Sequence, residues 1–163
     1  MIMSPTTTRV EDHTDVDINE EIYNRTKNNV LLYASAGPSA IDRRLRELEV
    51  EWDIERVLEA NAASFSLMGL ALGAFLDRRW FIFPAAVAGF LLQHAIQGWC
   101  PPVPLFRRMG IRTTPEIQQE RHALKALRGD YRDVAEIAGQ VNGADAPQVT
   151  HAFEAAGNHS SFS

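Results

Sequence analysis

The chain has 163 residues, of which 45% are hydrophobic and 23% are charged, and its formal net charge is −5. This length corresponds to about one domain. The acidic balance gives no indication of a nucleic-acid partner, and the single cysteine, Cys100, excludes a disulfide within the chain.

Residues 1–38 are predicted to form a disordered N-terminal tail, because residues 1–29 are rich in Thr, Asp, Glu and Asn. Residues 1–19 lack the apolar run that a cleavable signal peptide needs. If the protein enters a membrane, its first apolar helix must then serve as the insertion signal.

Residues 39–56 are predicted to form an amphipathic helix. Ser39 and Asp42 resemble a capping box at its start. Apolar residues then recur at helical spacing opposite a charged face: Ile41, Leu45, Leu48 and Trp52 against Arg43, Arg44, Glu47, Glu49 and Glu51. Such a helix lies along a membrane surface or packs against another copy of the chain, and the sequence leaves both possibilities open.

Residues 57–113 hold the two longest apolar runs and are predicted to form a transmembrane hairpin. Its spans cover about residues 58–76 and 80–99, with Asp77-Arg78-Arg79 as the turn. At about 1.5 Å per residue the first run reaches roughly 25 Å, close to the hydrocarbon thickness of about 30 Å. The alternative is a pair of core helices in a soluble protein. However, residues 65–76 show no polar stripe, and the rest of the chain is too small and too charged to cover two such helices.

Arginines near the ends of the hairpin predict its orientation. They flank the spans more densely than they occupy the turn: Arg43, Arg44, Arg46 and Arg56 precede it, and Arg107, Arg108 and Arg112 follow it. Both termini are therefore expected on the cytoplasmic side of a bacterial inner membrane. The residues expected at the membrane interfaces are Arg56, Arg78, Arg79, Trp80, Trp99, Arg107 and Arg108.

Residues 114–142 are predicted to form cytoplasmic amphipathic helices. Thr114 suits the N-cap and Pro115 the first position of a helix that ends before Gly129. A second short helix is expected from Asp130 to about Gly143. Residues 143–163 are expected to form a mostly disordered C-terminal tail.

Small residues recur at a spacing that favours close helix packing in membranes. Gly69 and Gly73 form a GxxxG motif in the first span, and Ala85 and Gly89 repeat the spacing in the second. The pattern fits packing within the hairpin and a seam between two copies equally well.

Gln93, His94 and Gln97 are the polar residues near the end of the second span, where an interhelical hydrogen-bonding role is expected. Without carboxylates or thiolates beside them they make a poor metal site, so neither a metal nor a cofactor is predicted. Cys100 follows the second span without an adjacent acid–base partner. The negative end of a helix and the nearby arginines would act oppositely on its thiol, and a structural role is favoured over a catalytic one.

Two short motifs flank the segment after the second span: Gly98, Cys100 and Pro101 first, then Gly110 and Thr113. They resemble the Gly-x-Cys-Pro and Gly-hydrophobic-x-Thr pattern of the YgaP-like two-helix inner-membrane domain family. Arg56 and the glycines of the first span also fit, so the resemblance covers roughly residues 52–113. It implies a dimerising two-helix domain that is sometimes fused to a rhodanese, a cysteine-based sulfurtransferase. This chain contains no rhodanese, and Pro102 and Pro104 depart from the pattern, so Cys100 does not inherit the rhodanese role.

The sequence therefore predicts an all-α protein: a two-helix transmembrane hairpin with amphipathic cytoplasmic helices on both sides. The expected partners are the lipid bilayer and other copies of the chain, and the predicted role is an oligomerising anchor or assembly module rather than an enzyme. Two alternatives stay open. One is a sulfur-relay accessory in which Cys100 works with a separate sulfurtransferase, and the other is a minimal oligomeric channel lined by Gln93, His94 and Gln97.

Overall fold

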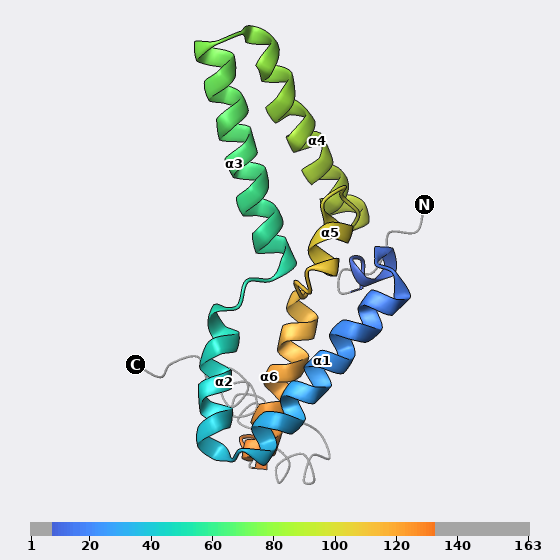
Figure 1. Ribbon diagram of the computed structural model, residues 1–163, viewed down its shortest axis with the longest axis vertical. Coiled ribbons are helices and arrows are strands. Elements are labelled where there is room, and N and C mark those ends of the chain that lie inside the picture. Colours follow the sequence, from blue (N-terminus) through green and yellow to red (C-terminus); the bar gives the residue numbers. More distant parts are fainter. Residues whose placement is uncertain (1–7, 133–163) are drawn as a thin grey trace, which may run out of the picture.

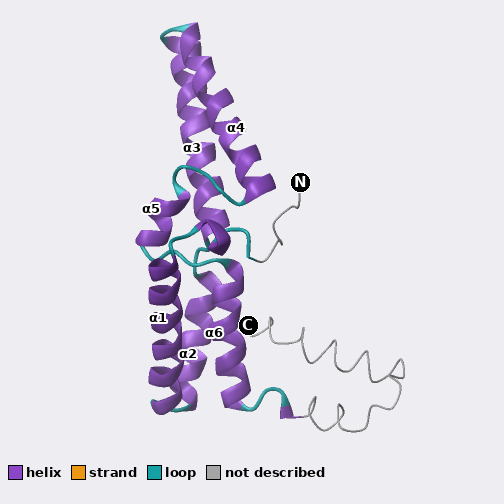
Figure 2. Cartoon of the chain, turned by 90° about the vertical axis from the view of Figure 1, so that its right-hand side faces the viewer, coloured by secondary structure: helices purple, strands orange, loops and turns teal. Residues whose placement is uncertain are grey.

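The computed structural model describes residues 8–132, which form helices and no strand. The elements are η1 (Glu11–His13), α1 (Val16–Ser35), α2 (Pro38–Val50), α3 (Ile54–Phe75), η2 (Arg78–Phe81), α4 (Ile82–Gln97), α5 (Val103–Arg108) and α6 (Thr114–Arg128). Helices α3 and α4 project as a long pair from one end of a bundle of α1, α2 and α6, and α5 lies at the junction (Figures 1 and 2). We call α1, α2, α5 and α6 the helical base.

Helices α3 and α4 lie side by side and are joined by η2. Glycines on α3 allow the close approach near this turn. A Cβ atom on Gly69 would lie 2.7 Å from Pro84 Cδ, and one on Gly73 would lie 2.8 Å from the ring of Phe81. Both glycines therefore serve packing within the pair. Gly89 differs, because it is exposed and nothing lies within 4 Å of a Cβ atom built on it.

Two helical stretches, Pro38–Phe75 and Arg78–Gln97, are long and apolar enough to cross a membrane. Only 17% and 6% of their most apolar windows are buried inside the protein. The core helix of a soluble protein would instead be mostly covered by its own chain. Large apolar side chains such as Phe75 and Ile82 are 85% and 77% exposed. The described part of the chain therefore leaves most of the α3/α4 surface uncovered.

The helical base has its own small core between α2 and α6. Ile41, Leu45 and Leu48 of α2 are buried against Ile117 and Leu124 of α6, so α2 packs through residues of the apolar face expected from the sequence. Trp52 does not belong to this core. It lies beyond the end of α2, is 49% exposed, and stacks under the guanidinium of Arg56 at 4.5 Å.

Helix α1 corrects the predicted disordered tail, residues 1–38, over Val16–Ser35, whereas residues 1–7 of that tail lie outside the described part of the chain. Its sequence is polar and weakly patterned, yet it packs against α6 and α2 and buries Ile22 and Thr26. The helix is stabilised by partners distant in sequence, which include the contact of Thr26 with Arg112. Its own composition carries no comparable signal.

Two helix boundaries also differ from the prediction. The helix expected over residues 39–56 is divided: α2 starts after Gly37 rather than Ser39 and ends at Val50, and α3 starts at Ile54. The break is stabilised by Asp53, whose side chain accepts a hydrogen bond from the Arg56 backbone N–H at 2.8 Å and so caps α3. The predicted helix near residues 130–143 and the predicted tail of residues 143–163 lie wholly or mostly outside the described residues.

Candidate functional site

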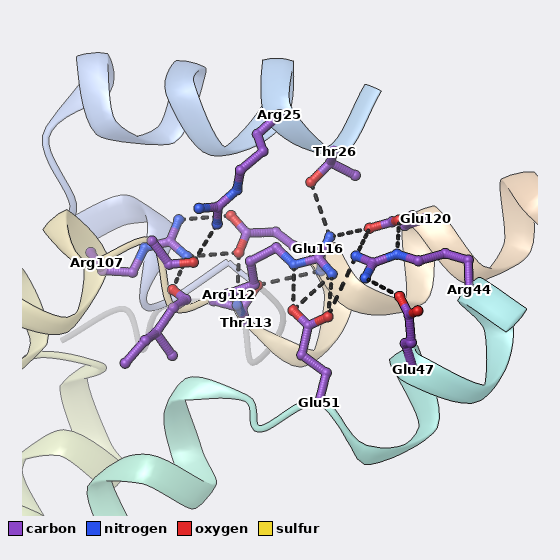
Figure 3. A network of polar contacts seen from close by, with 12 residues as sticks. Arg25, Thr26, Arg44, Glu47, Glu51, Arg107, Arg112, Thr113, Glu116 and Glu120 are labelled. Carbon is purple, nitrogen blue, oxygen red and sulfur yellow. Dashed lines mark hydrogen bonds and ion pairs between the residues drawn. The ribbon is translucent and has the colours of Figure 1, made fainter. Parts of the chain in front are cut away.

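Three arginines face three glutamates where the helical base meets the α3/α4 pair (Figure 3). We call this group the Arg–Glu cluster: Arg44, Glu51, Arg107, Arg112, Glu116 and Glu120. Its members come from α2, the link before α3, α5, the link before α6, and α6 itself. The cluster therefore joins elements that are far apart in the sequence.

Arg112 is the centre of the cluster and is only 3% exposed. Its Nε and one terminal nitrogen donate hydrogen bonds to the two oxygens of Glu51, both at 2.8 Å. Its other terminal nitrogen donates to Thr26 Oγ1 at 3.2 Å and to Glu120. Such a two-pronged arginine–carboxylate contact fixes the relative orientation of both groups.

Glu120 is fully buried and lies between two arginines. Arg44 Nε donates to one of its oxygens at 2.7 Å, and Arg112 donates to the other. Burial alone would raise the pKa of Glu120, but the hydrogen bonds from both arginines lower it. Glu120 is therefore held as a carboxylate and is unsuited to acid–base chemistry near neutral pH.

Arg107 and Glu116 form the second centre of the cluster. The fully buried Arg107 donates two hydrogen bonds of 2.7 Å to Glu116 and one of 2.9 Å to Asn19. Glu116 also accepts from the backbone N–H of Thr113 at 2.7 Å, and Thr113 caps α6 in return. Burial opposes ionisation of Glu116, but the contacts with Arg107 and Thr113 lower its pKa. Arg107 is therefore buried in the protein rather than exposed to lipid headgroups, and its predicted depth at the membrane interface stays a prediction.

A second polar contact lies at the ends of α3 and α4 that are far from the turn. His94 on α4 donates from Nε2 to Glu55 on α3 at 2.8 Å, and Arg9 donates to the other oxygen of Glu55 at 2.8 Å. His94 is 2% exposed, and its Nδ1 atom is buried without a hydrogen-bond partner among the described residues. The sequence did not indicate this acidic partner of His94, because Glu55 precedes the first apolar run.

The other two polar residues of the second span do not join this contact. Gln93 is half-buried and Gln97 is exposed. The two residues lie on the same helix, and Gln93 Nε2 is 3.5 Å from Gln97 Oε1. The three residues predicted to act together are thus divided between an interhelical contact of His94 and a pair within α4.

Cys100 lies in an apolar cluster with Val10, Ile54, Leu58 and Val103 at the junction of the base with the α3/α4 pair. It is 5% exposed, and burial raises the pKa of its thiol. The thiolate is the reactive form of cysteine, so this environment suppresses nucleophilic chemistry. Among residues 8–132 we find no group of three or more His, Cys, Asp or Glu side chains that could hold a metal ion.

The residues of the two short motifs occupy turns and caps. Gly98 ends α4 with φ +76°, and a Cβ atom there would lie 2.5 Å from the carbonyl oxygen of Arg9. Gly110 has φ +80° and its carbonyl accepts a hydrogen bond from Arg25. Thr113 is the N-cap of α6, one residue earlier than expected, and Pro101 is exposed beside Cys100. Local backbone geometry accounts for both glycines and the threonine.

The remaining predicted interface residues lie at both ends of the α3/α4 pair. Those of the turn are exposed, and Trp80 is 44% exposed. At the opposite end Trp99 is half-buried and Arg56 is exposed. Arg108 is exposed as well and pairs loosely with Asp15 at 3.4 Å.

These features define a helical protein in which two uncovered apolar helices stand on a small base closed by buried ion pairs. No protein-family model, curated protein or solved structure matches the chain. The resemblance to the YgaP-like family stays a prediction.

Proposed function

We propose that this chain is a membrane anchor whose α3/α4 pair crosses a bilayer as a hairpin and holds the helical base at one surface. The observation that carries the proposal is the uncovered apolar surface of α3 and α4. Of their most apolar windows, 17% and 6% are buried by the described chain. A continuous apolar surface of this kind is unfavourable in water and costs nothing in lipid.

The ends of the pair suit the two interfaces of a bilayer. The turn carries Arg78, Arg79 and Trp80, all exposed, which is a composition typical of headgroup depth. Both helices satisfy their backbone hydrogen bonds internally, as hydrocarbon requires. At the other end the chain enters the helical base, which contains the buried ion pairs of the Arg–Glu cluster. In this proposal both termini lie in the cytoplasm and the turn lies outside.

Membrane insertion is tested by expressing the full chain and washing membranes with alkaline carbonate. We expect the protein in the carbonate-resistant pellet. Orientation is tested with single cysteines in a Cys100→Ala background, at Arg78→Cys in the turn and at Ser163→Cys. A membrane-impermeant maleimide should label the turn cysteine in intact cells and the terminal one only after lysis. Recovery of a monodisperse helical protein from the detergent-free supernatant would overturn the proposal.

We also propose that the anchor associates with itself through the outer side of α4. Gly69 and Gly73 are occupied by contacts with Pro84 and Phe81, whereas the neighbourhood of Gly89 is open. Gly89→Leu should therefore reduce crosslinked dimers in membranes. Ala95→Leu is the matched control, because Ala95 is exposed on the same helix about 120° around its axis from Gly89. Equal crosslinking in both variants would remove the support for this seam.

The burial of Cys100 weighs against the sulfur-relay alternative, because a persulfide carrier must expose a reactive thiolate. The channel alternative loses support as well, since His94 is occupied by Glu55 instead of facing a pore together with both glutamines. Labelling of the wild-type chain by a persulfide donor, absent in Cys100→Ser, would restore the first alternative. Solute leak from proteoliposomes would restore the second.

A further inference from the structure

Helices α3 and α4 diverge away from their turn (Figure 1). An apolar cavity of about 360 Å³ lies between them, on the side of the helical base. Its walls come from the base-side halves of both helices and from residues 100–106; Leu58, Ala62, Leu91, Cys100 and Phe106 are among them. The one amide in the wall belongs to Asn61, whose side chain donates to the carbonyl of Val57 at 2.8 Å. The wall therefore offers almost no polar group to a ligand.

The cavity is continuous with the exposed apolar surface of the α3/α4 pair. Phe65 and Phe90 line it, and the same two residues are 46% and 45% exposed on the outside. An occupant therefore enters from the surface that the proposed anchor presents to lipid. A polar or charged molecule would lose its hydration here without compensation.

We propose that this cavity binds one acyl chain of a membrane phospholipid in the leaflet beside the helical base, an inference that rests on the proposed membrane insertion. A methylene group fills roughly the volume of a water molecule in the liquid, about 30 Å³, so the cavity accommodates a chain of about a dozen methylenes. Lipid and cavity are equally apolar, so the gain comes from filling a void with atoms in van der Waals contact.

The site is tested by photocrosslinking the full chain in vesicles. The vesicles contain phosphatidylethanolamine and phosphatidylglycerol, with a small fraction of a phospholipid that carries a diazirine on one acyl chain. After irradiation, adducts are mapped by mass spectrometry. We expect adducts at Leu91, Cys100 and Phe106, in addition to those at outward residues such as Leu67 and Leu92, which are 67% and 63% exposed.

Ala62→Trp fills the cavity and should abolish the three cavity adducts while those at Leu67 and Leu92 persist. Ala63→Trp is the matched control, because Ala63 is exposed on the same helix outside the cavity wall and its adduct pattern should equal that of the wild type. If Ala62→Trp does not fold, Leu91→Trp narrows the cavity from α4 instead, and its readout is the loss of the adducts at Cys100 and Phe106.

The outcomes separate this inference from the proposed function. Adducts at Leu67 and Leu92 without any in the cavity, or cavity adducts that survive both filling variants, would overturn the acyl-chain site and leave the anchor intact. Absence of adducts from all of α3 and α4 would overturn both.

Discussion

Glu55 accepts a hydrogen bond of 2.8 Å from His94, which joins the first turn of α3 to the last turns of α4. Arg9 occupies the other oxygen of the same carboxylate. The two apolar helices diverge away from their turn (Figure 1). The hydrogen bonds of Glu55 with His94 and Arg9 therefore connect the two helices at their divergent ends and connect the N-terminal segment to them. The strength of these hydrogen bonds depends on the charge of Glu55.

Glu55→Gln should destabilise the protein. The carboxylate accepts a hydrogen bond of 2.8 Å from His94 and another of 2.8 Å from Arg9. The amide of Gln keeps one acceptor oxygen, so one of these two donors loses its partner, and the charge that attracts Arg9 is removed. Thermal unfolding in detergent micelles at neutral pH, followed by circular dichroism, should show a lower melting temperature than for the wild type.

Glu59→Gln is the control for this experiment, because Glu59 is exposed about one turn further along α3. Its melting temperature should stay close to that of the wild type. Equal melting temperatures of Glu55→Gln and the wild type would show that the Glu55 carboxylate does not stabilise the pair.

The buried pair of Arg107 and Glu116 predicts a large effect from removing one partner. Arg107→Met leaves Glu116 without its two hydrogen bonds of 2.7 Å in a site where Arg107 is fully buried. Breaking a buried ion pair in this way costs about 3–5 kcal/mol. Chemical denaturation of the purified protein in micelles measures the change in unfolding free energy.

The adjacent Arg108→Met is the matched control. Arg108 and Asp15 are each about two-thirds exposed and 3.4 Å apart, and exposed pairs of this kind contribute about 0–1 kcal/mol. The double variant Arg107→Met with Glu116→Leu removes both charges and should recover part of the loss. Equal effects of Arg107→Met and Arg108→Met would mean that the cluster does not stabilise the base.

The apolar runs predicted where the two long helices lie, because seventeen or more uncharged residues leave few structural options. The Arg–Glu cluster could not be predicted in the same way. Arg112 and Glu51 are 61 positions apart, and Arg44 and Glu120 are 76 apart. No local spacing connects such partners, and the same arginines also fit a role in orienting the hairpin. Helix α1 was missed for a related reason, since its stabilising contacts come from α6 and α2.

Other differences could have been found from local patterns. Thr113 and Glu116 form a capping box, and their three-residue spacing is visible in the sequence. The prediction instead used Thr114 beside Pro115 as the N-cap and so placed the start of the helix one residue too late. Asp53 before α3 is a similar N-cap signal that marks the break in the predicted helix of residues 39–56.

Gly98→Ala should destabilise the protein, whereas Gly89→Ala should not. Gly98 adopts φ +76° at the end of α4, and a Cβ atom there would lie 2.5 Å from the carbonyl oxygen of Arg9. The left-handed conformation alone costs an alanine about 1–2 kcal/mol, and the contact with Arg9 adds to this. Gly89 lies within α4 with open space around it, and alanine is a better helix former by about 1 kcal/mol. Melting temperatures of both variants in the same detergent give the comparison, and equal losses would contradict the assigned cap.

Cys100 should react slowly with iodoacetamide in the native protein. It is 5% exposed within an apolar cluster, and burial raises the pKa of its thiol, so little thiolate is present at neutral pH. An exposed reference is Ser39→Cys in a Cys100→Ala background. We expect the rate for Cys100 at pH 7.5 to be at least about tenfold lower than for this reference, and the two rates to converge in denaturant, where burial is lost. Equal native rates would instead mean that the thiol is accessible as a thiolate, which is the property that a sulfur carrier requires and that the packing of Val10, Ile54 and Val103 around it opposes.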